Sequence, residues 1–85
     1  MDESLYEKLD SELRSLTEEI SSFCDADRAE VLHFVEVGEF GLALETAFAI
    51  AMEQRMHLTP GNKLTMESMA AHMGISDAID TNRLL

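Results

Sequence analysis

The sequence predicts an all-α fold, a small bundle of four to five helices joined by short connections. Apolar residues recur every three or four positions along most of the chain, and no segment alternates apolar and polar residues over the length of a strand. Of the 85 residues, 46% are hydrophobic, beside four glycines and one proline, which favours an ordered chain. No repeat or Pro/Gly/Ser-rich linker divides it, so residues 1–85 are expected to form a single domain.

The first helix is expected to begin near residue 4 and to continue through residue 23. Ser4 and Glu7 have the spacing of a capping box, which satisfies the first free amides of a helix. Ser15 and Glu18 repeat this spacing and could restart the helix midway, but one helix is favoured because the apolar stripe is unbroken. The stripe consists of Leu5, Leu9, Leu13, Leu16, Ile20 and Phe23.

The second and third helices are separated by a glycine. Asp27, followed three residues later by Glu30, is expected to cap a helix over residues 27–37. Gly38 suits the left-handed conformation that often follows a helix. Residues 39–56 then form a third helix, which is apolar around so much of its circumference that it should be the central one.

A turn is predicted at Thr59–Asn62, because proline disfavours helix in the preceding residue and Gly-Asn tolerates positive φ. Thr65 is expected to cap a fourth helix, with Leu64 and Met69 at the spacing of a hydrophobic staple, and Gly74 to end it. Residues 75–85 are expected to add one further turn or short helix. The inward row of the fourth helix comprises Met66, Met69, Ala70 and Met73.

No catalytic, cofactor-binding or metal-binding residues are predicted. No two of the histidines His33, His57 and His72 are four residues apart, and Cys24 has no histidine near it in the sequence. A domain of this size hides only about 60% of the surface of its unfolded chain, which disfavours a deep catalytic pocket. The protein is therefore not expected to be an enzyme.

Glu45 is a carboxylate within the densest apolar stretch, residues 40–50. A buried carboxylate needs compensating hydrogen bonds. Either Glu45 emerges on the solvent face, or it accepts hydrogen bonds from a neighbouring helix.

Residues 64–76 resemble the first helix and turn of a DNA-binding helix-turn-helix motif. In that case the recognition helix would be residues 77–85, where two aspartates and one arginine would face the phosphates. A helix-turn-helix-like regulatory protein using residues 64–85 is the alternative function. An acyl carrier protein is disfavoured, because the Asp-Ser-Leu motif that carries its prosthetic group is missing.

The charge is strongly acidic and uneven. Seventeen acidic against six basic residues give a net charge of −11, of which −7 lies in residues 1–30, −3 in residues 31–56 and −1 in residues 57–85. Such a surface repels nucleic acid and anionic membranes, so the expected partner is a basic protein. With one cysteine and no basic, apolar leader, the chain is expected to be cytoplasmic.

Some of these acids have a nearby base in the sequence. Lys8 with Glu12, and Asp10 with Arg14, are matched at i, i+4. The acids of residues 18–30 have only Arg28 as a nearby base, and Glu36 and Glu39 continue the same acidic arc. The predicted partner-binding residues are Glu18, Glu19, Asp25, Asp27, Glu30, Glu36 and Glu39.

Residues 28–75 resemble the small immunity proteins of bacterial contact-dependent growth inhibition and of the related Maf systems. The most specific elements of the resemblance are Gly38-Glu39 and Ala43-Leu44-Glu45, followed after the turn by Leu64-Thr-x-Glu67. The resemblance implies an inhibitor that forms a heterodimer with one cognate toxin domain, commonly a nuclease and in some systems an EndoU-type RNase. The acidic charge independently favours a basic nuclease as the partner.

Overall fold

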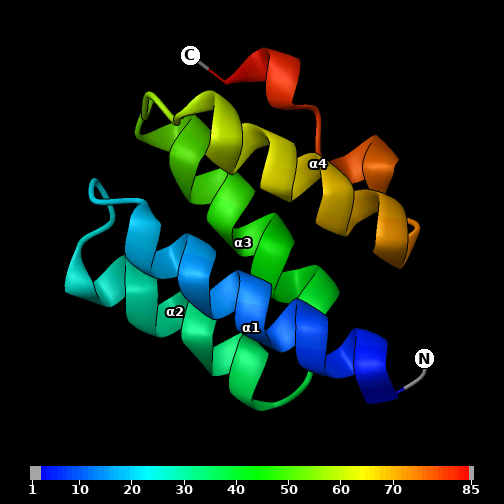
Figure 1. The fold of residues 1–85 in the computed structure, drawn as a ribbon. Coiled ribbons are helices and arrows are strands. Elements are labelled where there is room, and N and C mark those ends of the chain that lie inside the picture. The colour runs from blue at the N-terminus through cyan, green and yellow to red at the C-terminus, as the bar shows by residue number, and fades with distance from the viewer. Residues whose placement is uncertain (1–2, 85) are drawn as a thin grey trace.

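Four α-helices and two short 3₁₀ turns make up the fold in the computed structural model, which describes residues 3–84 (Figure 1). The helices are α1 (Glu3–Glu19), α2 (Asp25–Glu36), α3 (Phe40–Glu53) and α4 (Pro60–Met73). The 3₁₀ turns η1 (Ser76–Ala78) and η2 (Thr81–Arg83) follow α4. The predicted all-α bundle is thus confirmed.

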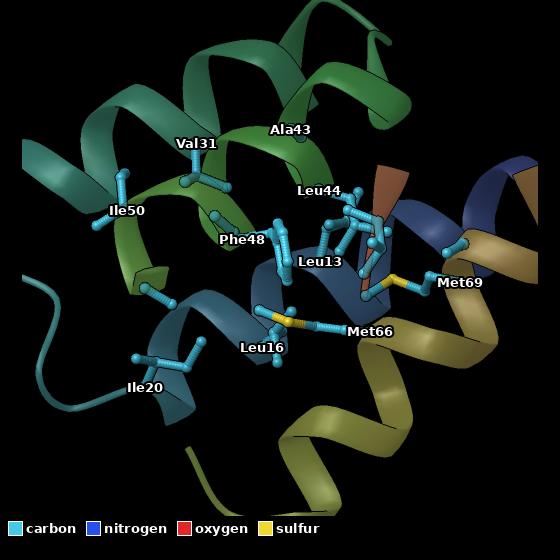
Figure 2. Close-up of a cluster of buried hydrophobic side chains, with 14 of the residues drawn as sticks. Leu13, Leu16, Ile20, Val31, Ala43, Leu44, Phe48, Ile50, Met66 and Met69 are labelled. Atoms are coloured by element: carbon cyan, nitrogen blue, oxygen red, sulfur yellow. The ribbon is translucent and has the colours of Figure 1, made fainter. Parts of the chain in front are cut away.

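The helix α3 lies at the centre of the bundle, as its apolar circumference predicted. It packs against α1, α2 and α4, while α1 and α2 form an antiparallel pair side by side (Figure 1). Met66 and Met69 of α4 point toward Leu16 of α1 and Leu44 of α3 (Figure 2). Both methionines are fully buried, which confirms their predicted place in the core, and Met73 packs partly buried against its edge.

The first helix is shorter than predicted. It ends at Glu19 instead of continuing to residue 23, although Ile20 and Phe23 are both buried. These two residues lie in the turn that leads to α2, and there they continue the apolar stripe of α1. At the other end, Glu3 is already helical, so Ser4 lies inside the first turn and not at its cap. The helix runs without a break through Ser15, so it does not restart there.

The predicted start of the second helix is also wrong. Cys24 precedes the first helical residue, Asp25, and Asp27 is the third residue of the helix. The Asp27 carboxylate accepts a hydrogen bond from the backbone N–H of Cys24 at 3.4 Å, as the acidic partner in a capping box does. The helix ends at Glu36, and Gly38 adopts the predicted left-handed conformation with a φ of 77°.

The turn predicted at Thr59–Asn62 is instead the beginning of α4. Thr59 caps the helix, and its Oγ1 accepts a hydrogen bond from the Asn62 N–H at 3.0 Å. Pro60 occupies the first helical position, where its missing N–H leaves no hydrogen bond unmade. Thr65 is therefore inside the helix, and Leu64 is 67% exposed instead of forming a staple. Gly74 ends the helix as predicted, with a φ of 71°.

The C-terminal segment folds back on α4. The Thr81 hydroxyl donates a hydrogen bond to the Glu67 carboxylate, and Ile79 and Leu84 are buried in the core. A helix-turn-helix motif needs a second helix after Gly74. Within the described residues this place is taken by two three-residue 3₁₀ turns, so the structure lacks the expected recognition helix.

Truncating a side chain at the centre of the core is expected to destabilise the fold strongly. Leu44 is 0% exposed, and Leu44→Ala should lower the free energy of unfolding by about 2–5 kcal/mol through lost contacts and a residual cavity. The exposed Leu64→Ala serves as control and should change it by less than about 0.5 kcal/mol. Urea unfolding followed by circular dichroism measures both, and equal effects would contradict the assigned core.

A second stability prediction concerns the end of α3. Arg55 has a φ of 51°, the one positive φ at a non-glycine position in residues 3–84. This conformation costs an L-residue roughly 1–2 kcal/mol and a glycine almost nothing. Arg55→Gly should therefore be more stable than Arg55→Ala by about 1 kcal/mol in urea unfolding, because both remove the guanidinium and only glycine relieves the strain. An alanine variant of equal or greater stability would contradict the prediction.

Candidate functional site

The predicted acidic residues lie at both ends and along both sides of α2. Glu18 and Glu19 end α1, Asp25 and Asp27 are in the first turn of α2, and the other three follow as far as the start of α3. All are exposed except Asp27, which is half-buried. The structure therefore collects them around the outer helix pair without bringing them onto one face.

The helical period divides the acids of α2 into two rows. Successive residues turn by about 100°, so Asp25 and Glu36, eleven positions apart, lie within about 20° of each other, whereas Glu30 lies about 140° from Asp25. The row with Glu36 faces the α1 side. There the pKa of Arg14 is raised, chiefly by its hydrogen bond to Asp10 and further by the charges of Asp10 and Glu36.

The second row consists of Asp27 and Glu30, and it begins beside the C-terminal end of α3. The Asp27 carboxylate accepts a hydrogen bond from Nε2 of Gln54 at 3.2 Å, which joins the first turn of α2 to the end of α3. Because Asp27 also bonds the Cys24 N–H, its carboxylate is already used within the fold. Asp27 is therefore a poorer candidate for partner binding than Glu30.

Glu19 belongs to a third side of the molecule. It lines a surface hollow together with Thr59, Gly61 and Asn62 at the beginning of α4. A carboxylate beside a helix N-terminus is stabilised by the exposed amides and by the helix dipole. Glu19 thus faces α4, whereas Glu18, one residue earlier and about 100° around the helix, is exposed and lines no part of this hollow.

Some of the acidic residues form ion pairs with a nearby base, and others do not. Asp10 bonds Arg14 at 2.7 Å, Glu12 pairs with Lys8 at 4.0 Å, and Asp25 lies 3.9 Å from Arg28. The two i, i+4 pairs predicted from the sequence are both present. Five of the seven predicted binding residues have neither an ion-pair partner within 4.0 Å nor a side-chain hydrogen bond among residues 3–84. These are Glu18, Glu19, Glu30, Glu36 and Glu39.

Arg28 has a role that the sequence analysis missed. Its Nε donates to the carbonyl of Thr17 and its Nη2 to the carbonyl of Ile20, both at 3.3 Å. The last carbonyls of a helix lack partners within the helix, so this half-buried guanidinium completes the end of α1. The base among the acids therefore fixes α1 against α2. Its isolation in an acidic segment was the available signal in the sequence.

The histidines and the cysteine lie apart from one another in the fold. His33 is exposed, with its ring edge-on to Phe34 at a centroid distance of 5.5 Å, and His57 is also exposed. Nδ1 of His72 is hydrogen-bonded to the Ser68 carbonyl at 2.9 Å. Cys24 is an exposed free thiol. Within residues 3–84 no three His, Cys, Asp or Glu side chains are grouped so that they could hold a metal ion.

Glu45 follows the first of its two predicted alternatives. It is half-buried on α3, and its carboxylate forms no hydrogen bond or ion pair with another described residue. The side chain therefore reaches solvent from the flank of an otherwise apolar helix.

Comparison with known proteins adds no relative: no family model, curated protein or solved structure matches the chain. None of the helices in residues 3–84 combines the length and the apolar character needed to cross a bilayer.

The five unpaired carboxylates are expected to repel one another in the free protein. Salt screens this repulsion, so raising NaCl from about 0.05 M to about 0.5 M should increase the free energy of unfolding. The variant Glu18→Gln/Glu30→Gln/Glu39→Gln should gain less from salt, by about 0.2–0.5 kcal/mol for each unfavourable pair removed. Unfolding in urea, which is uncharged, measures this difference, and identical salt dependence in both proteins would contradict it.

Proposed function

We propose that the protein is an immunity protein, an inhibitor that binds a basic nuclease toxin domain and covers its RNA-binding cleft. The observation that carries the proposal is the set of exposed carboxylates on α1, on α2 and before α3 that have no basic partner within the described residues. The resemblance of residues 28–75 to immunity proteins of contact-dependent growth inhibition and Maf systems supports the same function. An EndoU-like RNase is the toxin type that this resemblance favours.

The proposed inhibition needs no chemistry. A nuclease holds the phosphates of its substrate in a cleft lined by basic side chains, and carboxylates of the inhibitor would compete with the phosphates for these side chains. Glu18, Glu30 and Glu39 are the principal contacts, because each is exposed and its carboxylate is free of hydrogen bonds within the described part of the chain. Asp25 and Asp27 instead interact within the fold, with Arg28 and with the Cys24 N–H at the start of α2.

The large unbalanced charge has a second consequence. Complementary charge steers diffusional encounter and raises association rates by roughly 10–1,000-fold at low salt. An inhibitor of a toxin benefits from fast binding, since each free toxin molecule keeps cutting RNA until it is bound. The excess of acid therefore suits rapid capture as well as complementarity in the complex.

Charge reversal tests the proposal. The product of the adjacent open reading frame, which the proposal expects to be a basic nuclease domain, is co-expressed with the protein, and a complex is purified for titration calorimetry. The variant Glu18→Lys/Glu30→Lys/Glu39→Lys should lose several kcal/mol of binding, roughly a hundredfold or more in Kd, because close charge pairs at an interface couple by about 1.5–7 kcal/mol each. It should also fail to protect cells from the toxin.

The matched control is Glu7→Lys/Glu53→Lys/Asp77→Lys, which reverses three exposed carboxylates elsewhere and changes the net charge equally. It should weaken binding by less than about tenfold, through long-range attraction alone. An equal loss of affinity in both variants would show that net charge, and not the three proposed positions, accounts for the effect. Full protection by the first variant would contradict the proposed binding residues.

A further inference from the structure

An apolar hollow lies at the end of the bundle opposite the α1–α2 turn. There the beginning of α1, the connection from α2 to α3, the first turn of α3 and the end of α4 come together (Figure 1). The hollow has a volume of about 380 Å³. Its apolar lining comes from three separate stretches of the sequence and consists of Leu5, Phe40, Met73 and Ile75. None of the acidic residues of the α1–α2 turn contributes to it.

Two glycines line this hollow, and only one of them is required by the backbone. Gly38 has a φ of 77°, and a Cβ there would lie 3.2 Å from the Tyr6 hydroxyl. Gly41 is the second residue of α3, its φ is not positive, and a Cβ there would meet only Cδ1 of Ile75, at an ordinary 3.9 Å. A helix favours almost any other residue over glycine. The fold gives no reason for Gly41, whereas a larger side chain there would fill the hollow.

Exposed apolar side chains continue from the hollow onto the surface. Tyr6 is 44% exposed and stands edge-on to Phe40, with ring centroids 4.7 Å apart. Val37, beside Gly38, is 59% exposed. Single exposed apolar residues are common on proteins, but an open apolar hollow bordered by such residues is typical of a binding surface.

The charge at this end indicates what occupies the hollow. Glu39 lines it, and Glu36 precedes Val37; neither has an ion-pair partner within 4.0 Å among residues 3–84. No lysine or arginine lines it. A second copy of the chain would bring another net charge of −11 to these carboxylates, which opposes self-association. The complementary occupant is cationic.

The polar groups around the hollow do not suit a small polar ligand. Such sites have a few polar groups that converge on the ligand and orient it. Here the polar side chains are a single carboxylate, that of Glu39, and His72, whose Nδ1 is already bonded to the Ser68 carbonyl. An apolar side chain of a polypeptide needs no such groups.

We propose that this hollow binds one large apolar side chain of a cationic polypeptide segment, whose flanking lysines or arginines pair with Glu36 and Glu39. The charge of the segment rests on the proposed function, and the apolar anchor is an addition to it. Interfaces draw most of their affinity from a few buried apolar or aromatic anchors, while surrounding charges govern encounter and specificity. The acidic residues would attract the partner, and the hollow would hold it.

Three peptides test the proposal against the full-length protein. The first is acetylated and amidated Arg-Lys-Ser-Phe-Ser-Lys-Arg, the second has Ser in place of Phe, and the third has Glu in place of every basic residue. Titrations followed by amide NMR should show the first peptide displacing the signals of Gly38, Gly41 and Ile75. It should bind at least about tenfold more tightly than either of the other two.

Gly41→Leu fills the hollow and leaves the net charge unchanged. It should abolish the advantage of the Phe-containing peptide over its Ser counterpart. Gly61→Leu is the matched control, since Gly61 is also the second residue of a helix and a Cβ there would meet only Oγ1 of Thr59, at 3.8 Å. Circular dichroism checks that both are folded, and the smaller Gly41→Ala should give an intermediate loss if the leucine variant does not fold.

The inference would be overturned by equal binding of the Phe and Ser peptides, by equal binding of the acidic peptide, or by unchanged binding of the Phe peptide to Gly41→Leu. Concentration-dependent self-association with shifts at the same three amides would also overturn it in favour of a second copy. Failure here is distinguishable from failure of the proposed function. If Gly41→Leu binds the toxin normally while Glu18→Lys/Glu30→Lys/Glu39→Lys does not, the acidic residues are needed for toxin binding and the apolar hollow is not.

Discussion

Burial of α3 against the other three helices is the constraint on which the rest of the structure depends. Ala43, Ala47 and Ala51 are at most 1% exposed, and their small side chains allow the neighbouring helices to approach closely. A helix in this position has little room for charge, because a buried carboxylate without partners is strongly unfavourable. The acidic residues are therefore concentrated on the outer helices α1 and α2, where water solvates them. The central helix and the acidic exterior thus follow from one division of the sequence into apolar and charged segments.

The sequence predicted the helical elements better than it predicted their ends. Periodic apolar positions report which residues are buried, and burial does not stop where hydrogen bonding of the helix stops. Ile20 and Phe23 are buried from a turn, so the stripe of the first helix overran its end. Pro60 could be read as a break or as a first helical residue, and the Thr59 cap decides for the second. Gly38 and Gly74 were placed correctly because a left-handed residue after a helix strongly favours glycine.

The candidate site was predictable in composition and unpredictable in geometry. Counting charges located the acidic segment, but the direction of each carboxylate depends on how α2 is rotated against α1 and α3. That rotation placed Asp27 against Gln54, which is 27 positions away in the sequence. It also turned Arg28 onto Thr17 at the end of α1, 11 positions away. The apolar hollow was beyond sequence analysis for the same reason. Its lining residues come from three separate stretches of the sequence, which only the packing of the bundle brings together.

The central claim is that unpaired carboxylates on α1 and α2 recognise a cationic protein, and the salt dependence of that complex tests it most directly. The Kd of the complex with the proposed basic toxin domain is measured between about 0.05 M and 0.5 M NaCl, a range over which the Debye length falls severalfold. The account predicts a Kd that rises steeply with salt, mainly through slower association. A Kd that is independent of salt would contradict it, because charge would then contribute nothing to the affinity of the complex.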